Sequence, residues 1–254
     1  MKKKLYILHH LGMGDHIHCN GMIRYIRETL NLEWTISVFS WERNSNNVEY
    51  MFRDNESIEI IPLIDDVDEI SQANNYIQND EHVEDSRLLL LGFNHYSQIK
   101  TKHPEYTCDQ CFYEQIDVPY KYRFEKFYYE REFEEENRVY EKLVPKGKEY
   151  VFVHDNPPKG YNINTNKIDS KYEIVKNDIS ESIFHFAKIL ENASEIHCIE
   201  SAFRCFIEGL DTSKAKHYFH PANTEFAKFD NSNLGSGTSK EWNYVEYGQP
   251  SNML

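Results

Sequence analysis

The chain has 254 residues, of which 40% are apolar, and its 28 lysines and arginines against 42 aspartates and glutamates give a formal net charge of −14. This composition is typical of a globular protein with one large domain or two smaller ones. It argues against a protein that binds nucleic acid or anionic lipid across its surface, because such binding requires clustered lysine and arginine side chains. We therefore expect no nucleic-acid partner.

The first half of the chain alternates short apolar runs with segments of helical character. We expect strands at Lys4–His9, Trp34–Ser40, Ile58–Pro62 and Arg87–Leu91. Helical segments are expected between them at Ile17–Leu30, Val48–Arg53 and Val67–Gln78. Strands that alternate with helices in this way predict crossover connections around a parallel sheet.

The middle of the chain is less regular. Residues 94–129 are rich in aromatic side chains without a clear period, and we interpret them as packing beneath a long loop. Glu130–Leu143 is charged and helical in character, and the sequence Pro145-Lys146-Gly147-Lys148 then interrupts the pattern. We expect an α/β domain at 1–128, a linker helix within 129–148 and a second α/β domain at 149–254.

The alternation of strands and helices resumes in the second half. We expect strands at Tyr150–His154, Glu195–Ile199 and Lys216–Phe219, with helices at Ile179–Glu191 and Ser201–Gly209. The tail 223–254 is rich in Asn, Ser and Gly. Its aromatic residues Trp242, Tyr244 and Tyr247 indicate that part of it packs back on the domain.

The sequence predicts no integral membrane segment. The apolar run that follows Lys2–Lys4 ends at Leu8, too early for a signal peptide. No later segment reaches the roughly 18 apolar residues that a membrane span needs. Five thinly spread cysteines make a disulfide framework improbable and favour a reducing compartment. We therefore expect a cytoplasmic protein.

The first candidate site is the turn Leu11-Gly12-Met13-Gly14-Asp15, between the first strand and the first helix. Glycines at such a turn let the backbone approach a ligand, and a helix start favours anions. A dinucleotide fingerprint would require glycine where Ile17 stands. Asp15 lies where a general base would stand at the mouth of a parallel sheet. The alternative is that Asp15 caps the following helix.

Two further patterns could hold a metal ion. His9, His10, His16 and His18 crowd the same turn, but a spacing of two residues on a helix directs the last two side chains apart. The Cys108–Cys111 pair lacks the second pair of cysteines that a zinc ribbon needs. We therefore expect no metal site, and a metal-dependent hydrolase built on the histidines remains an alternative.

The second half contributes two motifs at strand ends. His154-Asp-Asn-Pro-Pro-Lys159 follows a buried-type strand, and its loop presents the cation of Lys159, which suits a diphosphate. Glu200-Ser201 ends the next strand and begins a helix. Its helix start could accept phosphate, and Glu200 could accept sugar hydroxyls. The simpler interpretation is that Ser201 is a helix cap.

Together these motifs resemble a small glycosyltransferase of the GT-B architecture, in which two Rossmann-like domains face each other across a cleft. Leu11-Gly12-Met13-Gly14-Asp15 is similar to the Leu-Gly-Asp turn of the heptosyltransferase family, whose aspartate is the catalytic base. Glu195–Phe203 resembles that family's strand ending in Asp-Ser/Thr at the donor nucleotide, with Glu200 replacing aspartate. Val151–His154 is similar to the His-Val-Arg strand of fucosyltransferases, with Lys159 as the nearest substitute for the arginine.

The resemblance implies transfer of a sugar from a nucleotide-diphosphate sugar to a glycan or other acceptor hydroxyl, with inversion and without a metal or other cofactor. It implies Asp15 as the catalytic base. The implied donor-binding residues are Gly12, Gly14, His154, Lys159, Glu200 and Ser201. A protein of the same fold that binds a nucleotide or sugar without catalysis is an alternative, as is a purely structural partner protein.

Overall fold

The structure is a computed structural model that describes residues 3–30, 33–81, 86–221 and 237–245. The chain divides into two compact units, Met1–Arg131 and Glu132–Leu254, which are called unit 1 and unit 2 below. Within the described ranges, the structure contains no helix that is long and apolar enough to cross a bilayer.

Unit 1 is built on a sheet of four parallel strands in the order β3-β2-β1-β4. The strands are β1 (Lys3–Leu8), β2 (Trp34–Trp41), β3 (Ile58–Leu63) and β4 (Ser86–Leu90). The helices are α1 (Met13–Thr29), α2 (Glu42–Phe52), α3 (Glu69–Gln78), α4 (Asn94–Lys102), α5 (Cys108–Gln115) and α6 (Tyr122–Glu125). The predicted alternation and the parallel sheet are confirmed.

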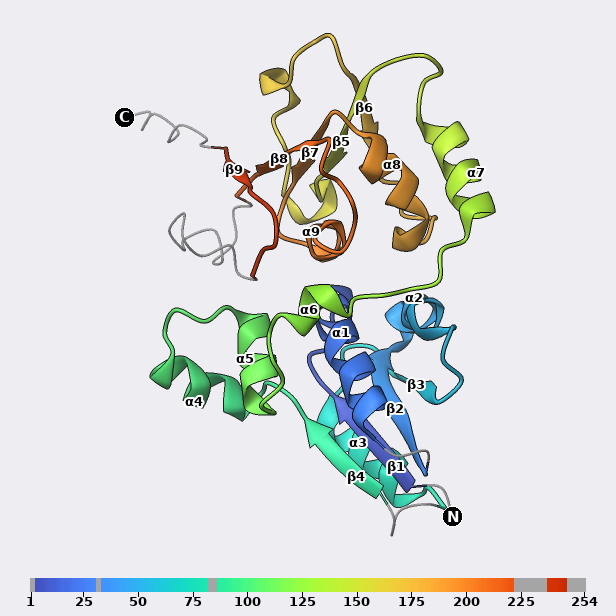
Figure 1. The fold of residues 1–254 in the computed structure, drawn as a ribbon, viewed down its shortest axis with the longest axis vertical. Coiled ribbons are helices and arrows are strands. Elements are labelled where there is room, and N and C mark those ends of the chain that lie inside the picture. Colours follow the sequence, from blue (N-terminus) through green and yellow to red (C-terminus); the bar gives the residue numbers. More distant parts are fainter. Residues whose placement is uncertain (1–2, 31–32, 82–85, 222–236, 246–254) are drawn as a thin grey trace. The chain divides into compact units, whose positions relative to one another are not determined.

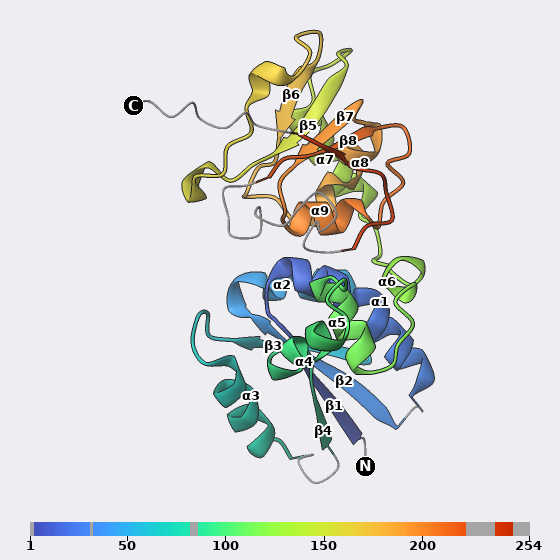
Figure 2. The same cartoon turned by 90° about the vertical axis from the view of Figure 1, so that its left-hand side faces the viewer.

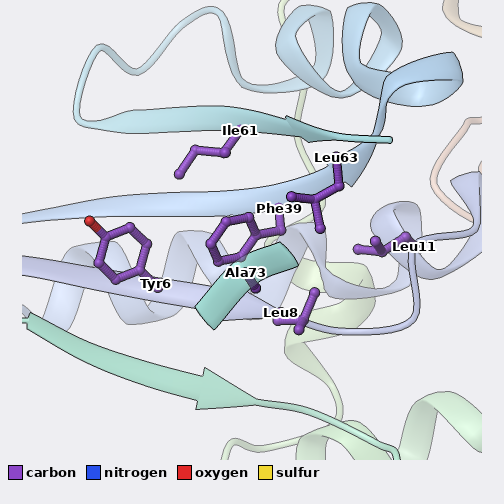
Figure 3. Close-up of a cluster of buried hydrophobic side chains, with 7 residues drawn as sticks. All are labelled: Tyr6, Leu8, Leu11, Phe39, Ile61, Leu63 and Ala73. Carbon is purple, nitrogen blue, oxygen red and sulfur yellow. The ribbon is translucent and has the colours of Figure 1, made fainter. Parts of the chain in front are cut away.

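The core of unit 1 forms because alternate residues of each strand point to the same face of the sheet. Tyr6 and Leu8 of β1 lie in one buried cluster with Phe39 of β2 and Ala73 of α3. Figure 3 shows these side chains with Leu11, Ile61 and Leu63 on one face of the sheet. Helix α3 covers this face, and α1 lies on the opposite face (Figures 2 and 3).

Two predictions for unit 1 are wrong. Helix α1 begins at Met13, well before the expected Ile17, because Gly12 adopts an extended conformation and serves as the N-cap. The segment 94–129 is not a long loop, since α4, α5 and α6 lie within it. A capping box between Thr107 and Gln110 begins α5, so that polar side chains, not an apolar period, mark this helix.

Unit 2 contains a second parallel sheet, in the order β6-β5-β7-β8-β9. The strands are β5 (Tyr150–His154), β6 (Glu173–Lys176), β7 (Glu195–Cys198), β8 (Lys216–Phe219) and β9 (Asn243–Tyr244). The α-helices are α7 (Phe133–Leu143), α8 (Ala187–Asn192) and α9 (Ala202–Ile207), and the 3-10 helices are η2 (Pro157–Lys159), η3 (Thr165–Lys167) and η4 (Ile183–Phe186). Figure 1 shows α7 beside α8 in this unit.

Several features of unit 2 differ from the sequence expectations. Strand β6 was not predicted, and the helix expected at Ile179–Glu191 is η4 followed by α8, because Ser182 caps the chain at Phe184. Helix α7, which lies inside the expected linker segment, packs against η4 and α8. Part of the tail does pack back, since β9 pairs with β8. Tyr247 lies outside the described residues.

Candidate functional site

Each sheet has a switch point, where the chain stops adding strands on one side and continues on the other. In unit 1, β2 and β3 extend one side of β1 and β4 lies on the other, so this point falls between β1 and β4. The carboxyl ends of these two strands meet there, since the amide of Leu91 donates to the carbonyl of Leu8 at 2.8 Å. Open α/β sheets bind ligands at such crevices.

The turn that carries Asp15 lies at this end of β1. The Gly12 carbonyl accepts the first helical hydrogen bond of α1, from the His16 amide at 3.1 Å. Asp15 stands in the first turn of α1, and a Cβ on Gly12 would lie only 2.7 Å from its Oδ2. Glycine at position 12 therefore makes room for the carboxylate. The N-cap interpretation of Asp15 is wrong because Gly12 is the N-cap. Gly14 lies within the same first turn.

The charge of Asp15 acts on two cysteines. Burial raises the pKa of the Cys19 thiol well above its ordinary value of 9.0, and Asp15 acts in the same direction. Burial also raises the pKa of Cys108 in α5, again with a contribution from Asp15. Both thiols are therefore protonated at neutral pH.

The histidines near the turn have separate environments. His9 and His16 are fully buried, with ring centroids 4.4 Å apart. Burial lowers the pKa of His9 to about 4 and that of His16 well below 6.5, so both rings are neutral at pH 7. The Nδ1 atom of His18 lies 3.0 Å from Nε of buried Arg123. In the part of the chain that the structure describes, no group of three or more His, Cys, Asp or Glu side chains could hold a metal ion.

The fourth histidine, His10, lies against the turn between β4 and α4. Its Nε2 accepts a hydrogen bond from the Phe93 amide at 3.2 Å. The Gln115 side chain holds the same turn, accepting from the Gly92 amide at 2.8 Å and donating to the Leu90 carbonyl at 2.6 Å. These partners could not be identified from the sequence, because Leu-Gly-Phe after a strand is only a general signal for a turn.

Unit 2 has its own switch point, between β5 and β7. The Ile199 amide donates to the carbonyl of His154 at 3.3 Å, which joins the carboxyl ends of these strands. The His154 ring lies 4.5 Å from that of Phe203, and its Nδ1 lies 2.9 Å from Oδ1 of Asn177. Burial lowers the pKa of His154, so the ring is neutral at pH 7 and supplies hydrogen bonds without charge.

Two lysines lie near the end of β5. Lys159 is exposed at the end of η2, in a loop closed by backbone hydrogen bonds between Asn156 and Tyr161. Lys176 ends β6, and its Nζ lies 2.8 Å from Oδ2 of buried Asp155. Lys176 was not among the predicted site residues, because strand β6 itself was not predicted.

Glu200 and Ser201 follow β7. Both carboxylate oxygens of Glu200 accept hydrogen bonds from buried Arg204, at 2.7 and 3.1 Å. Ser201 is the N-cap residue of α9, but its side chain makes no capping hydrogen bond and its Oγ lies 3.7 Å from Sγ of Cys198. The prediction that Ser201 is a helix cap is therefore confirmed for its position, although its hydroxyl does not bond to the helix.

The predicted donor-binding residues are divided between the two units. Gly12 and Gly14 lie with Asp15 at the switch point of unit 1. The others belong to unit 2, where His154 ends β5, Lys159 ends the following η2 turn, and Glu200 and Ser201 follow β7.

Comparison with solved structures shows a resemblance of fold. No protein-family model and no curated protein sequence matches the chain. One similar structure is that of a glycosyl transferase family 9 protein from Veillonella parvula DSM 2008. Its sequence is 9% identical to this chain, and the match covers 96% of this chain and 87% of that protein with a TM-score of 0.54. E. coli ADP-heptose LPS heptosyltransferase II is 8% identical, with coverages of 98% and 92% and a TM-score of 0.48. E. coli heptosyltransferase WaaC with ADP is 10% identical, with coverages of 96% and 93% and a TM-score of 0.44. This chain therefore has a mixed α/β fold with parallel sheets that resembles that of the family 9 glycosyl transferase.

Proposed function

We propose that this protein is an inverting glycosyltransferase that moves a sugar from a nucleotide-diphosphate sugar to an acceptor hydroxyl without a metal ion. One observation carries the proposal: in a fold shared with a family 9 glycosyl transferase, the Asp15 carboxylate stands in the first turn of α1, where the carboxyl ends of β1 and β4 meet. A carboxylate at such a switch point can act as a general base on a bound hydroxyl.

In the proposed reaction, Asp15 takes the proton of the acceptor hydroxyl. The acceptor oxygen forms a bond to the anomeric carbon while the bond from that carbon to the diphosphate oxygen breaks, and its electron pair leaves with the diphosphate. Attack from the opposite side inverts the anomeric centre. A positioned base contributes about 10²- to 10⁴-fold in rate.

Unit 2 is proposed to bind the donor. Lys159 would neutralise the departing diphosphate, and the Ser201 hydroxyl would donate a hydrogen bond to it. Neutral His154, whose Nδ1 faces Oδ1 of Asn177, would accept a hydrogen bond from a donor hydroxyl at Nε2. Glu200 is fixed by Arg204, yet a carboxylate offers about four lone-pair sites, so it can still accept a bond from a ribose or sugar hydroxyl.

The first experiment measures thermal stabilisation by a panel of nucleotide diphosphates and nucleotide sugars, with and without EDTA. A ligand that binds only the folded protein stabilises it by RT ln(1 + [L]/Kd). We expect one nucleotide class to stabilise the protein equally in both conditions. No stabilisation by any nucleotide would contradict the proposal, and stability lost in EDTA would favour the metal-dependent hydrolase instead.

The second experiment tests the base. Asp15→Asn keeps the shape of the side chain but removes its basicity, so we expect transfer to fall about 10²- to 10⁴-fold while nucleotide stabilisation stays unchanged. Asp117→Asn is the matched control, because Asp117 is exposed and its φ of 55° suits asparagine. Nucleotide binding without transfer in the wild-type protein would identify a binding protein rather than an enzyme. Transfer within a few fold of wild type in Asp15→Asn would exclude the base assignment.

A further inference from the structure

The His10 side chain is fixed on several sides at the switch point of unit 1. Its ring lies between the rings of Phe93 and Phe112, with centroid distances of 5.1 and 5.5 Å. A Cβ on Gly92 would lie 2.8 Å from Nε2 of His10, so the turn passes too close to the imidazole for any other residue at position 92. Helices α4 and α5 lie beyond the arrowhead of β4 in Figure 1. The ring is therefore held in one orientation before any ligand arrives.

The hydrogen bond from Phe93 fixes the tautomer of this ring. Burial lowers the pKa of His10, with the charge of Glu69 acting in the opposite direction, so the ring is neutral at pH 7. A neutral imidazole that accepts a hydrogen bond at Nε2 carries its proton on Nδ1. Within the described ranges Nδ1 has no hydrogen-bond partner, and the side chain is only partly buried. The Nδ1–H of His10 is thus an oriented donor that is available to a ligand.

The turn that makes this arrangement is strained. Gly92 has a φ of 83°, and Phe93 has a φ of 50° with a ψ of −128°. A bulky residue with positive φ is strained and persists only where its surroundings enforce it. The hydrogen bonds from Gln115 and His10 to the turn hold it in this conformation. Such strain is concentrated at ligand-binding sites, which gives the turn a functional interpretation.

His10 and Asp15 are both linked to helix α5, His10 by a ring contact and Asp15 by its charge. Phe112 contacts the His10 ring, while the charge of Asp15 acts on Cys108, and these two α5 residues are one helical turn apart. Both side chains also come from the short connection between β1 and the first turn of α1. An acceptor bound at Asp15 would therefore lie within the same corner of unit 1 as His10.

We propose that His10 is an acceptor-binding residue, whose Nδ1–H donates a hydrogen bond to a neutral oxygen of the acceptor, such as a second hydroxyl beside the one that Asp15 deprotonates. This inference rests on the proposed transferase function. A neutral N–H donor adds no charge to the site, so its contribution is to orient the acceptor. His10 neither takes nor gives a proton in the reaction.

Two substitutions separate this role from a purely structural one. His10→Gln carries its amide at the position of Nε2, so it can keep the bond from the Phe93 amide but loses the Nδ1 donor. His10→Asn carries its amide at the position of Nδ1, so it keeps a donor there but loses the bond to Phe93. His95→Gln is the control, because His95 is exposed in the neighbouring helix α4.

For His10→Gln we expect thermal stability and nucleotide stabilisation close to wild type, with a raised acceptor KM and a kcat/KM reduced roughly threefold to tenfold, as for loss of one neutral hydrogen bond. His10→Asn should lose thermal stability but retain more of the kcat/KM for acceptor. The reverse order, with Gln equal to wild type and Asn impaired in transfer, would overturn the inference and leave only the structural bond to Phe93.

A spectroscopic measurement makes the inference testable apart from the enzyme assay. Nitrogen-15 NMR of the wild-type imidazole should show the proton of His10 on Nδ1, and a proton on Nε2 would overturn the inference directly. Failure of the proposed function looks different, since the wild-type protein would then neither bind a nucleotide sugar nor transfer from it, whatever the His10 tautomer.

Discussion

Glu208 joins the C-terminal segment to helix α9 and offers a sharp test of the structure of unit 2. Its Oε2 accepts hydrogen bonds from the amide and the hydroxyl of Ser239, at 2.6 and 2.7 Å. Its Oε1 accepts from Nε1 of Trp242 at 2.7 Å and lies 3.7 Å from Nη1 of Arg204. The side chain is buried, so solvent cannot replace these partners.

Glu208→Gln conserves volume but removes the charge and one acceptor oxygen. If the amide oxygen keeps the Ser239 bonds, the amide nitrogen faces two donors, from Trp242 and Arg204, and the buried indole N–H loses its partner. An unsatisfied buried donor costs about 1–3 kcal/mol, and breaking a buried charge pair costs about 3–5 kcal/mol. Because Arg204 keeps its bonds to Glu200, we expect a loss of about 3 kcal/mol, near the lower value for a broken pair.

Trp242 reports this change directly. It is one of three tryptophans, and the other two, Trp34 and Trp41, lie in unit 1, so both are replaced by phenylalanine in the background for the assay. Urea unfolding followed by Trp242 fluorescence should give the loss of about 3 kcal/mol, and the melting temperature should fall by roughly 10 °C. Glu241→Gln removes the same charge from an exposed neighbour and is the control. A Glu208→Gln protein within about 0.5 kcal/mol of that control would refute the reasoning.

Two further predictions concern unit 1. In Gly21→Ala, the better helix propensity of alanine stabilises the protein by about 1 kcal/mol, but the new Cβ would lie 2.0 Å from the backbone oxygen of Tyr122 in α6. We therefore expect the free energy of unfolding, measured by thermal unfolding, to fall by about 2 kcal/mol in total. A neutral or stabilised variant would contradict this packing. Burial lowers the pKa of His9 from 6.5 to about 4, so the unfolded chain protonates first and the free energy of unfolding falls between pH 6.5 and about 4. Urea unfolding of His9→Asn across this range should show a shallower fall than wild type, and an equal slope in both would exclude His9 as its source.

The α/β pattern and most strand positions could be predicted because most strands contain several apolar or aromatic residues within a short span. Tyr150–His154 and Lys216–Phe219 have the predicted bounds, and the other predicted strands differ by one or two residues. The pattern failed where packing is not periodic in the sequence. Strand β6 has four residues, of which only Val175 is buried, so it leaves no apolar run to detect. Helix α5 could have been predicted only from its capping box, in which Thr107 and Gln110 stand three residues apart.

The candidate site was predictable only in part, for a related reason. A glycine turn after an apolar strand is a local signal, and it located Asp15 at the carboxyl end of β1. His9 and His10 are adjacent in the sequence, yet one is fully buried and the other binds the strained turn at Phe93, 83 positions away along the chain. Contacts of that range depend on the order of strands in the sheet, which one sequence does not specify.

Under the proposed function, the charges around the end of β5 favour one of two lysines as the partner of the diphosphate. The sequence analysis proposed Lys159 as the nearest substitute for an arginine, and the structure adds Lys176 at the end of the neighbouring strand. The positive charge of Lys176 is largely offset by buried Asp155, whose two oxygens lie 2.8 and 3.1 Å from its Nζ. Among the described residues Lys159 has no ion-pair partner, and its exposed loop leaves the full charge available. A departing diphosphate would therefore gain more from Lys159, while the pair of Asp155 and Lys176 fixes the strand ends around it.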